Sequence, residues 1–565
     1  MRARAQRLSR RASFPKSRCV NLHPGGIIEN SPAFQRWGHG GFAISPAGTV
    51  EIGSAQPSLR DSHHTGRSPS VETPGYSRLP LRGRHRDQNL SIPGAQRNCG
   101  RIFSQPIRRL RAALFAVFIL RLALGMGAAH GAMNSGWSFG AAQAKITPTN
   151  LFWMGGFASR TRPADGTLDD LWVKALLLEA PDGGRAVLVT ADLVGSPKWL
   201  YDDLCRELEQ RYGLGRSQLR FASSHTHSGP VLKDALQDIY PLDDRQRALI
   251  ADYSKWLERT MLNTVARALG SRRPATLWTG EGRATFAMNR RANDESKLTE
   301  MLRRGEAPKG PSDFSVPILA VRSPEGELRA VVFGYAAHTS ALTDNYKWSA
   351  DYAGQTQRSL EGRHPGAVAM FCQGCGSDQS AVPRGTVERM QNLGEQLAAA
   401  VEAVLATPMT SVAPKLRTAF AFTSLDFGEQ PTTTELEAAA KADNYRARWA
   451  KRLLAESAAG RTFMRGYPEY PVQAWELGTN LLWLALGGEV CVDYALRFRK
   501  EYGADTWVTG YANDVMAYIP SRRLWEEGGY QAGAFDVYGL PVNRWCPDIE
   551  ERIASTVTRL VKGVR

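Results

Sequence analysis

Histidine is scarce in the main part of this 565-residue chain and stands where metal chemistry would use it. Residues 133–565 hold four histidines, and His225 and His227 lie two positions apart in the segment Ser-His-Thr-His-Ser-Gly-Pro. In an extended chain this spacing points both imidazoles to one face, which suits a metal ligand beside a second imidazole that binds substrate or transfers a proton. Two hydrogen-bonded structural histidines would show the same pattern, so the motif alone leaves both interpretations open.

Two further segments could complete such a site. His338 follows the apolar run 331–337, where a histidine is either a ligand or a structural residue. Residues 370–380 form a strand-like run followed by a glycine-rich turn that contains Asp378 and Ser380. Such a turn can present a nucleophile and backbone N–H groups to an oxyanion, or it can be an ordinary polar turn before a helix.

The last candidates lie late in the chain. Glu489 follows two glycines, so its carboxylate could reach a cation without steric hindrance, or it could be a solvated loop carboxylate. Tyr518 and Tyr530 also follow glycine-containing segments, and without a site around them they would be half-buried packing residues.

A Cys-x-x-Cys pair, Cys372 and Cys375, precedes the Asp378 turn. The sequence has no second pair with this spacing, which argues against a zinc ribbon. Buried thiols or a local disulfide remain as interpretations.

The elements that would position these residues alternate between strands and helices. Short apolar runs predict strands at 171–178, 186–190, 219–222, 330–335 and 367–371. Helical periodicity predicts helices at 199–212, 245–269 and 386–406. This alternation predicts an α/β fold, which we expect to be a mixed-sheet catalytic domain with flanking helices.

The beginning of the chain has a different composition. Residues 1–107 are rich in Arg, Ser, Pro and Gly, and we expect a disordered basic extension, or an upstream segment from a misassigned start codon. Residues 108–132 combine a basic flank, a short apolar core and small residues, which predicts a signal peptide; a buried or interfacial helix is the alternative. The run is too short to span a bilayer. Residues 133–565 would then be an exported domain, either periplasmic or secreted.

The net charge of +16 belongs to the beginning of the chain. Residues 1–111 hold 19 basic and 5 acidic residues, whereas residues 112–565 hold 52 and 50. A nucleic-acid-binding surface requires clustered Lys and Arg on the domain itself, so this balance argues against a nucleic-acid partner.

In order and spacing, these segments resemble the neutral/alkaline, non-lysosomal ceramidase family, and Ser-His-Thr-His-Ser-Gly-Pro is the strongest shared signature. The resemblance covers the chain from about residue 146 to residue 530 and the catalytic domain of the family. It implies a Zn²⁺ site whose ligands are His225, His338, Glu489 and Tyr518. It also implies that His227, Arg290 of the Asn-Arg pair, and Tyr530, twelve residues after Tyr518, face the substrate.

The reaction that this resemblance implies is zinc-dependent hydrolysis of an N-acyl amide, as in the conversion of N-acylsphingosine to sphingosine and fatty acid. Zinc would generate hydroxide near neutral pH and polarise the carbonyl, while His227, Arg290 and Tyr530 would orient the amide and stabilise the oxyanion. Ser380, beside Asp378, would be the nucleophile or a hydrogen-bonding positioner. The substrate would be lipid-like or another N-acyl amide, and peripheral contact with a membrane is compatible with it.

Two departures from the family weaken the inference of ceramide as substrate. The family hexapeptide Gly-Asp-Val-Ser-Pro-Asn is replaced by Ser-Asp-Gln-Ser-Ala-Val at 377–382. Only 35 residues follow Tyr530, so we expect no C-terminal immunoglobulin-like domain of the kind that the family carries. A zinc amidase or esterase acting on a non-ceramide acyl substrate, and a catalytically inactive exported binding protein of the same fold, are therefore alternatives.

Overall fold

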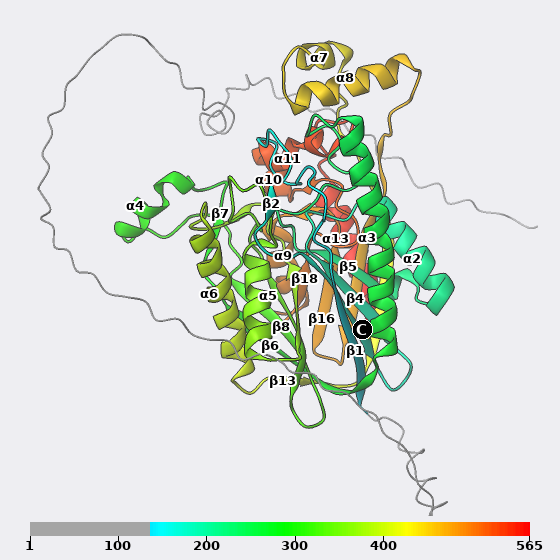
Figure 1. The fold of residues 1–565 in the computed structure, drawn as a ribbon, viewed down its shortest axis with the longest axis vertical. Coiled ribbons are helices and arrows are strands. Elements are labelled where there is room, and N and C mark those ends of the chain that lie inside the picture. Colours follow the sequence, from blue (N-terminus) through cyan, green and yellow to red (C-terminus); the bar gives the residue numbers. More distant parts are fainter. Residues whose placement is uncertain (1–135) are drawn as a thin grey trace, which may run out of the picture. The chain divides into compact units, whose positions relative to one another are not determined.

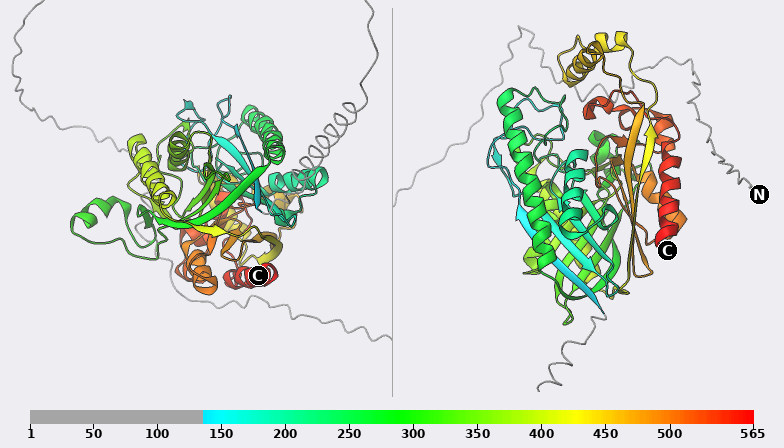
Figure 2. Two further views of the ribbon diagram at one scale, coloured as in Figure 1. Left: turned by 90° about the horizontal axis from the view of Figure 1, so that it is seen from below. Right: turned by 90° about the vertical axis from the view of Figure 1, so that its right-hand side faces the viewer.

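The computed structural model describes residues 136–565. The predictions made for residues 1–107 and 108–132 concern a part of the chain that lies outside the described residues. Within the described part, two β-sheets pack face to face and helices cover their outer faces (Figures 1 and 2). The predicted α/β fold with a mixed sheet and flanking helices is confirmed.

The larger sheet has the strand order β11-β9-β8-β6-β1-β3-β4-β5, with β13 paired to β6. The pairs β9–β11 and β4–β5 are parallel and the other neighbours are antiparallel, so the sheet is mixed. Its strands are β1 (Trp137–Lys145), β3 (Trp172–Glu179), β4 (Arg185–Ala191), β5 (Leu219–Ser223), β6 (Arg273–Arg283), β8 (Ser315–Arg322), β9 (Leu328–Tyr335), β11 (Val368–Gln373) and β13 (Thr410–Val412).

The second sheet has the order β14-β15-β16-β18. Its strands are β14 (Leu416–Asp426), β15 (Gly466–Leu477), β16 (Leu481–Leu486) and β18 (Trp507–Thr509), and the β16–β18 pair is parallel. Between the two sheets lies an apolar core that includes Trp475, Trp483 and Trp507. Trp483 stacks on Trp507 with ring centroids 4.2 Å apart. Truncation of such a buried tryptophan to alanine typically costs about 3–5 kcal/mol of stability.

Helices cover the outer face of each sheet. The pair α2 (Lys198–Tyr212) and α3 (Asp244–Gly270) packs on the β1-β3-β4-β5 half of the larger sheet, and α5 (Asp351–Arg363) and α6 (Val387–Leu405) cover the other half. The second sheet is covered by α9 (Val492–Tyr502) and α13 (Ile549–Val564). Gly140 allows α3 to approach β1 closely, because a Cβ at this position would lie 2.0 Å from the Ala268 carbonyl oxygen.

The sequence-predicted elements agree with this arrangement. The predicted helices correspond to α2, α3 and α6, and the predicted strands to β3, β4, β5, β9 and β11. Capping residues explain two of the helix starts: the side chains of Asp243 and Thr386 accept hydrogen bonds from the backbone N–H of Gln246 and Arg389.

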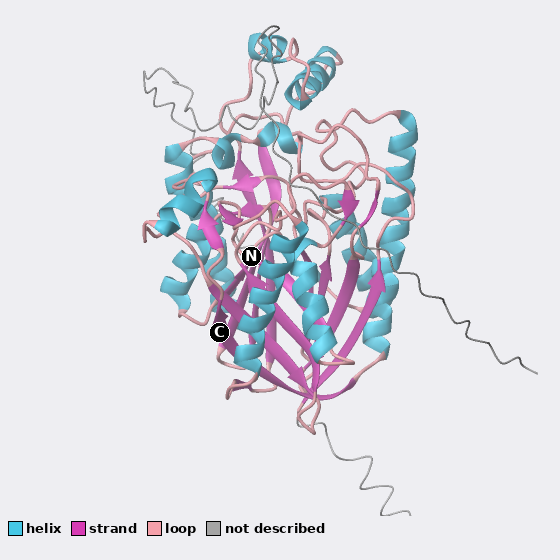
Figure 3. Ribbon diagram, turned by 60° about the vertical axis from the view of Figure 1, so that its left-hand side comes forward, coloured by secondary structure: helices cyan, strands magenta, loops and turns pink. Residues whose placement is uncertain are grey.

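Shorter helices and strands connect these elements, and Figure 3 shows the helices, strands and loops of the described part in another view. They are β2 (Gly166–Thr167), β7 (Ala287–Asn289), β10 (Lys347–Trp348), β12 (Gln379–Ala381), β17 (Glu489–Val490), β19 (Tyr518–Ile519), α4 (Leu298–Arg303), α7 (Thr433–Ala439), α8 (Tyr445–Ala458), α10 (Arg522–Glu527), α11 (Tyr530–Gly533) and α12 (Phe535–Tyr538). In the described part of the chain, none of the helices has the length and apolarity needed to cross a bilayer.

Candidate metal centre

Three parallel strand pairs deliver the candidate ligands to one place. His225 follows β5, His338 follows β9, and Glu489 follows β16 after two glycines. Each of these strands belongs to a parallel pair, and the carboxyl ends of paired parallel strands lie at the same edge of a sheet. The face-to-face packing of the two sheets brings these edges together, so residues from three regions of the sequence meet there.

The imidazoles form one buried cluster. The Nε2 atoms of His225 and His338 are 3.0 Å apart, and those of His225 and His227 are 3.1 Å apart. One Glu489 oxygen, Oε2, lies 3.3 Å from Nε2 of His225 and 3.5 Å from Nε2 of His338. All four side chains are less than a tenth exposed.

Backbone carbonyls fix the proton positions on two of the rings. Nδ1 of His225 lies 2.6 Å from the Val194 carbonyl oxygen, and Nδ1 of His338 lies 3.1 Å from that of Gly376. A carbonyl oxygen only accepts hydrogen bonds, so in the neutral form of each ring Nδ1 is the protonated nitrogen and Nε2 carries a lone pair. Two imidazole lone pairs and a carboxylate oxygen therefore face one another.

This donor set fits a divalent cation. Ligand atoms 2.0–2.1 Å from a tetrahedral zinc lie about 3.3–3.4 Å from one another. The distances of 3.0, 3.3 and 3.5 Å among His225 Nε2, His338 Nε2 and Glu489 Oε2 are close to that separation. Imidazole nitrogen and carboxylate oxygen are also ordinary zinc ligands. His225, His227 and His338 are close enough for all three to contribute to a metal site.

Electrostatics favours the metal-binding form of the histidines. Burial lowers the pKa of His338 well below its ordinary value, and the Arg290 guanidinium lowers it further. Burial likewise lowers the pKa of His227, with additional effects from His225 and Arg160. These rings are therefore neutral near pH 7, which is the form that binds metals.

His227 is enclosed by the loop that follows residue 153. Gly156 has φ +111°, and a Cβ there would lie 2.4 Å from the imidazole, so this position requires glycine. The Phe157 ring meets the imidazole edge-on at 4.7 Å, and Arg160 Nη2 donates to the His227 carbonyl oxygen at 2.6 Å. His227 Nδ1 lies on the side of this loop and is buried without a hydrogen-bond partner among the described residues, whereas Nε2 faces His225.

Tyr518 lies beside Glu489, because β17 and β19 pair in parallel with these two residues in register. Burial and the Glu489 carboxylate raise the pKa of Tyr518 well above its ordinary value, and Arg290 opposes this shift. The hydroxyl would thus need a cation to become a phenolate. Tyr530 packs edge-to-face on Tyr518 at 5.2 Å, so both tyrosines border the cluster.

Arg290 lies between residues 377–382, which we call the serine loop, and the tyrosines Tyr518 and Tyr530. Its backbone N–H donates to the Asp378 carbonyl oxygen at 2.8 Å, and its guanidinium donates to the Ser377 carbonyl oxygen. Burial lowers the pKa of Arg290, but the neighbouring Tyr518 and Glu489 outweigh it and the pKa is raised. Nε is buried without a partner among residues 136–565, which leaves a donor for a bound ligand.

The serine loop places its two candidates differently. Ser380 is buried in β12, which forms a bridge with His338, and the His338 N–H donates to the Gln379 carbonyl oxygen at 2.8 Å. The Asp378 carboxylate accepts the Val492 N–H at 2.9 Å, at the start of α9. Burial raises the pKa of Asp378 to about 6. In this place the carboxylate anchors the loop to α9, whereas Ser380 adjoins a histidine of the cluster.

Two tyrosines at the cluster were not predicted. The Tyr511 ring lies 4.3 Å from that of His225, and the Tyr538 hydroxyl donates to Glu489 Oε1. Tyr511 belongs to the Gly-Tyr-Ala-Asn-Asp segment before Tyr518, so its proximity to that candidate was a usable signal. No comparable signal marks Tyr538.

Cys372 and Cys375 are buried free thiols, so the local disulfide is wrong and the buried-thiol interpretation is confirmed. Burial raises the pKa of Cys372 to about 12 and also raises that of Cys375, which makes both thiols poor metal ligands and nucleophiles.

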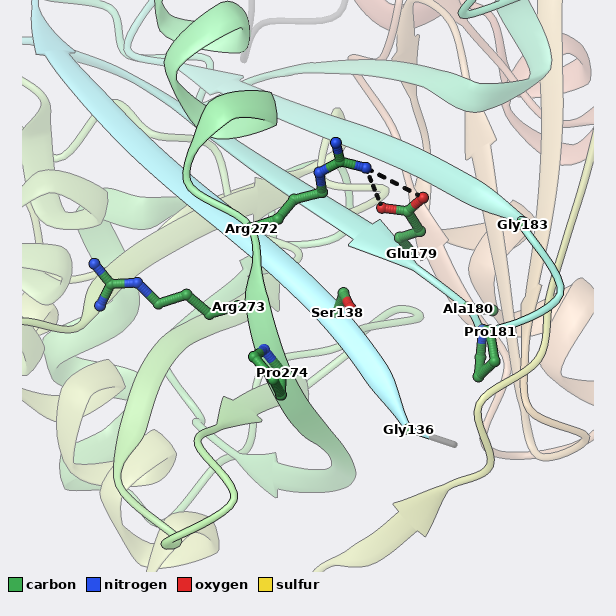
Figure 4. Close-up of a pocket in the computed structure, with 9 residues that line it drawn as sticks. All are labelled: Gly136, Ser138, Glu179, Ala180, Pro181, Gly183, Arg272, Arg273 and Pro274. Carbon is green, nitrogen blue, oxygen red and sulfur yellow. Dashed lines mark hydrogen bonds and ion pairs between the residues drawn. The ribbon is translucent and has the colours of Figure 1, made fainter. Parts of the chain in front are cut away.

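A cavity of about 420 Å³ lies at the opposite end of the larger sheet (Figure 4). An ion pair between Arg272 and Glu179, 3.1 Å long, crosses its wall, and the described residues that line it include no histidine. It is therefore separate from the cluster.

Comparison with known proteins identifies the fold. No family model and no curated protein matches the sequence. Among solved structures, a neutral ceramidase from Pseudomonas aeruginosa matches with a TM-score of 0.57 and 19% identity, covering 75% of this chain and 74% of that one. The chain has the neutral ceramidase fold. A ceramidase complexed with C2 also matches, with a TM-score of 0.57 and 17% identity over 75% of this chain and 76% of that one.

Proposed function

We propose that this chain is a zinc-dependent hydrolase of N-acyl amide bonds that acts in the manner of a ceramidase. The observation that carries the proposal is the convergence of His225 Nε2, His338 Nε2 and Glu489 Oε2 within 3.5 Å of one another. The neutral ceramidase fold supports it, because the family resemblance assigns zinc to the same three residues and to Tyr518.

In this proposal, His225, His338, Glu489 and Tyr518 hold the cation. A bound zinc ion would supply Lewis-acid activation of the scissile carbonyl and of water, whose pKa it lowers to about 7. Because Nδ1 of both histidines is held by a backbone carbonyl, the two rings are oriented before the metal binds.

Other side chains of the site orient the amide. Arg290 Nε is a buried donor without a partner among the described residues, and His227 Nε2 lies at the cluster, 3.1 Å from Nε2 of His225. Such groups stabilise the charge that develops on a carbonyl oxygen when an acyl group is attacked. Tyr530 packs edge-to-face against Tyr518, which in this proposal is a metal ligand. Ser380 either attacks the acyl carbon or bonds to the substrate from its position beside His338.

One observation favours a substrate other than ceramide. The loop 377–382 lacks the glycine and the Pro-Asn pair of the family hexapeptide, and this loop adjoins both His338 and Arg290. A changed loop at the reacting centre changes the groups that the substrate meets. The second candidate is therefore a zinc amidase or esterase on a different acyl substrate.

The test is hydrolysis of a panel by the zinc-loaded and the chelator-treated protein. The panel contains N-acylsphingosines, short-chain acyl amides and matched acyl esters. We expect turnover of at least one amide that disappears on chelation and returns with zinc. N-acylsphingosine turnover selects the ceramidase-like function, and turnover restricted to short amides or esters selects the second candidate. Equal turnover with and without metal would contradict both.

A further inference from the structure

The Glu489 carboxylate is contacted on both oxygens by tyrosines outside the proposed ligand set. Oε2 faces the two histidines, and the Tyr511 hydroxyl lies 3.5 Å from it. Oε1 accepts a hydrogen bond from the Tyr538 hydroxyl. The two oxygens therefore have different surroundings: Oε2 faces the two histidines, with the Tyr511 hydroxyl at the limit of hydrogen-bond distance, whereas the Tyr538 hydroxyl bonds Oε1 closely.

Tyr511 connects the segment that contains Glu489 with the strand that precedes His225. Its N–H donates to the Gly488 carbonyl oxygen at 3.0 Å, and its carbonyl oxygen accepts the Ser223 N–H at 3.2 Å. Its backbone thus links the residue before Glu489 to the strand before His225, and its ring covers a face of the His225 imidazole at 4.3 Å. Tyr511 has φ +51°, a conformation that a non-glycine residue keeps only where its surroundings hold it.

Tyr538 is held from the other side by the helical hairpin α7–α8. It ends α12, and the following carbonyl oxygen, that of Gly539, accepts a 2.7 Å hydrogen bond from Arg452 of α8. Trp449 of α8 donates to the Leu540 carbonyl oxygen at 3.0 Å. Arg452 is itself paired with Asp238 at 2.7 Å. These contacts fix the end of α12, and with it the position of the Tyr538 hydroxyl.

We propose that Tyr511 and Tyr538 are positioning residues for Glu489 as a metal ligand: Tyr538 occupies Oε1 and so leaves Oε2 to the metal, and Tyr511 holds the Glu489 segment against His225. The inference rests on the metal site of the proposed function. A carboxylate can bind a cation through one or both oxygens, and a phenol that donates to one oxygen favours binding through the other. Groups that orient a ligand in this way typically change metal affinity about 10- to 100-fold when they are removed.

The experiment compares cobalt binding by the wild type with binding by Tyr538→Phe, Tyr511→Phe and the double variant. Cobalt(II) reports the number and geometry of its ligands through its visible absorption. Tyr253→Phe is the matched control, because it removes a buried hydroxyl that bonds the Ile146 carbonyl oxygen at 2.6 Å, away from the cluster. The readouts are stoichiometry, affinity by chelator competition and the visible spectrum, with thermal unfolding as a check on folding.

We expect Tyr538→Phe to bind cobalt about 10- to 100-fold more weakly with an altered spectrum, Tyr511→Phe to show a smaller change of the same kind, and Tyr253→Phe to match the wild type. Wild-type affinity and spectrum in both site variants would overturn the positioning role while leaving the metal site intact. A wild type that binds no cobalt would overturn the metal site and the positioning role together.

A crystal structure of the cobalt-loaded wild type tests the same inference without any variant, should the substitutions prevent folding. We expect one Glu489 oxygen at about 2.0–2.2 Å from the metal and the other bonded to Tyr538. Both oxygens at bonding distance from the metal would overturn the inference.

Discussion

The Nε2 atoms of His225 and His338 lie 3.0 Å apart, although 113 positions separate the two residues in the chain. Both rings have Nδ1 against a backbone carbonyl, so in their neutral forms neither has a proton to place between the two Nε2 nitrogens. Two lone pairs at this distance repel each other unless a cation lies between them. The short distance between the two Nε2 atoms therefore indicates a metal site, and it also means that this arrangement of the two rings is favourable only when the metal is bound.

His338→Ala should remove both metal and activity. It deletes one nitrogen ligand and leaves a gap opposite His225, so we expect less than about a tenth of wild-type zinc content and no measurable amide turnover. Elemental analysis and the amide assay on the same preparation measure both quantities.

His364→Ala is the matched control, because His364 is paired with Glu402 at 3.0 Å on the side of α5 and takes no part in the cluster. It should retain zinc and turnover. Normal zinc in His338→Ala would show that this residue is no ligand.

Ser380→Ala separates the two roles left open for the serine. It removes only a hydroxyl from β12, so zinc content should be that of the wild type. If Ser380 is the nucleophile, turnover should fall by at least about 10²-fold. Unchanged turnover in the zinc-loaded variant would exclude attack by this residue.

We expect Asp378 to affect activity indirectly, because its carboxylate holds the serine loop in place. Asp378→Asn keeps an oxygen that can accept the Val492 N–H, whereas Asp378→Ala leaves this buried donor unpaired. We therefore expect Asn to retain most turnover and Ala to lose about 1–3 kcal/mol of stability together with activity. Urea unfolding and turnover of both variants provide the readout. An inactive but fully stable Asn variant would instead indicate that the carboxylate takes part in the chemistry.

Asp514 should make stability depend on pH. Burial raises its pKa to about 7, although the Tyr467 hydroxyl donates to the carboxylate and opposes the shift. The unfolded value is about 3.9, so between these values the folded state holds a proton that the unfolded state has released. The contribution of this group to the free energy of unfolding therefore decreases as pH rises from about 4 to 7. Above pH 7 the full cost of burying the ionised carboxylate is present, and no further change is expected.

Asp514→Asn removes this ionisation. Between pH 5 and pH 8 the variant should lose less stability than the wild type, by about 2 kcal/mol. Urea unfolding of the metal-loaded proteins at the two pH values measures the difference. Equal losses in both proteins would show that the carboxyl is not protonated in the folded state at pH 5.

The candidate ligands could be predicted because local sequence carries the necessary signals. His225 and His338 follow apolar runs that become β5 and β9, and Glu489 follows a glycine pair in which Gly488 has φ +72°. A strand end with a polar residue can be recognised without knowing its neighbours. The resemblance to a family then supplied the grouping of these residues that spacing alone left open.

What could not be predicted depends on contacts between distant segments. The direction of the Asp378 carboxylate is set by the backbone N–H of Val492, 114 residues later. The position of the Tyr538 hydroxyl depends on the hydrogen bond between Arg452 of α8 and the Gly539 carbonyl oxygen. The strand β1 is rich in small residues and shows no apolar run, yet it lies between β3 and β6 in the larger sheet. Its place follows from pairing with β3 and from the close approach of α3 to Gly140.

The most direct test of the central claim is the metal content of the purified wild-type protein, measured per chain by elemental analysis. Four ligands around a single cation predict about one zinc per chain, bound tightly enough to survive desalting. A metal-free preparation that still hydrolyses an N-acyl amide, and that takes up no zinc when it is offered, would contradict the account.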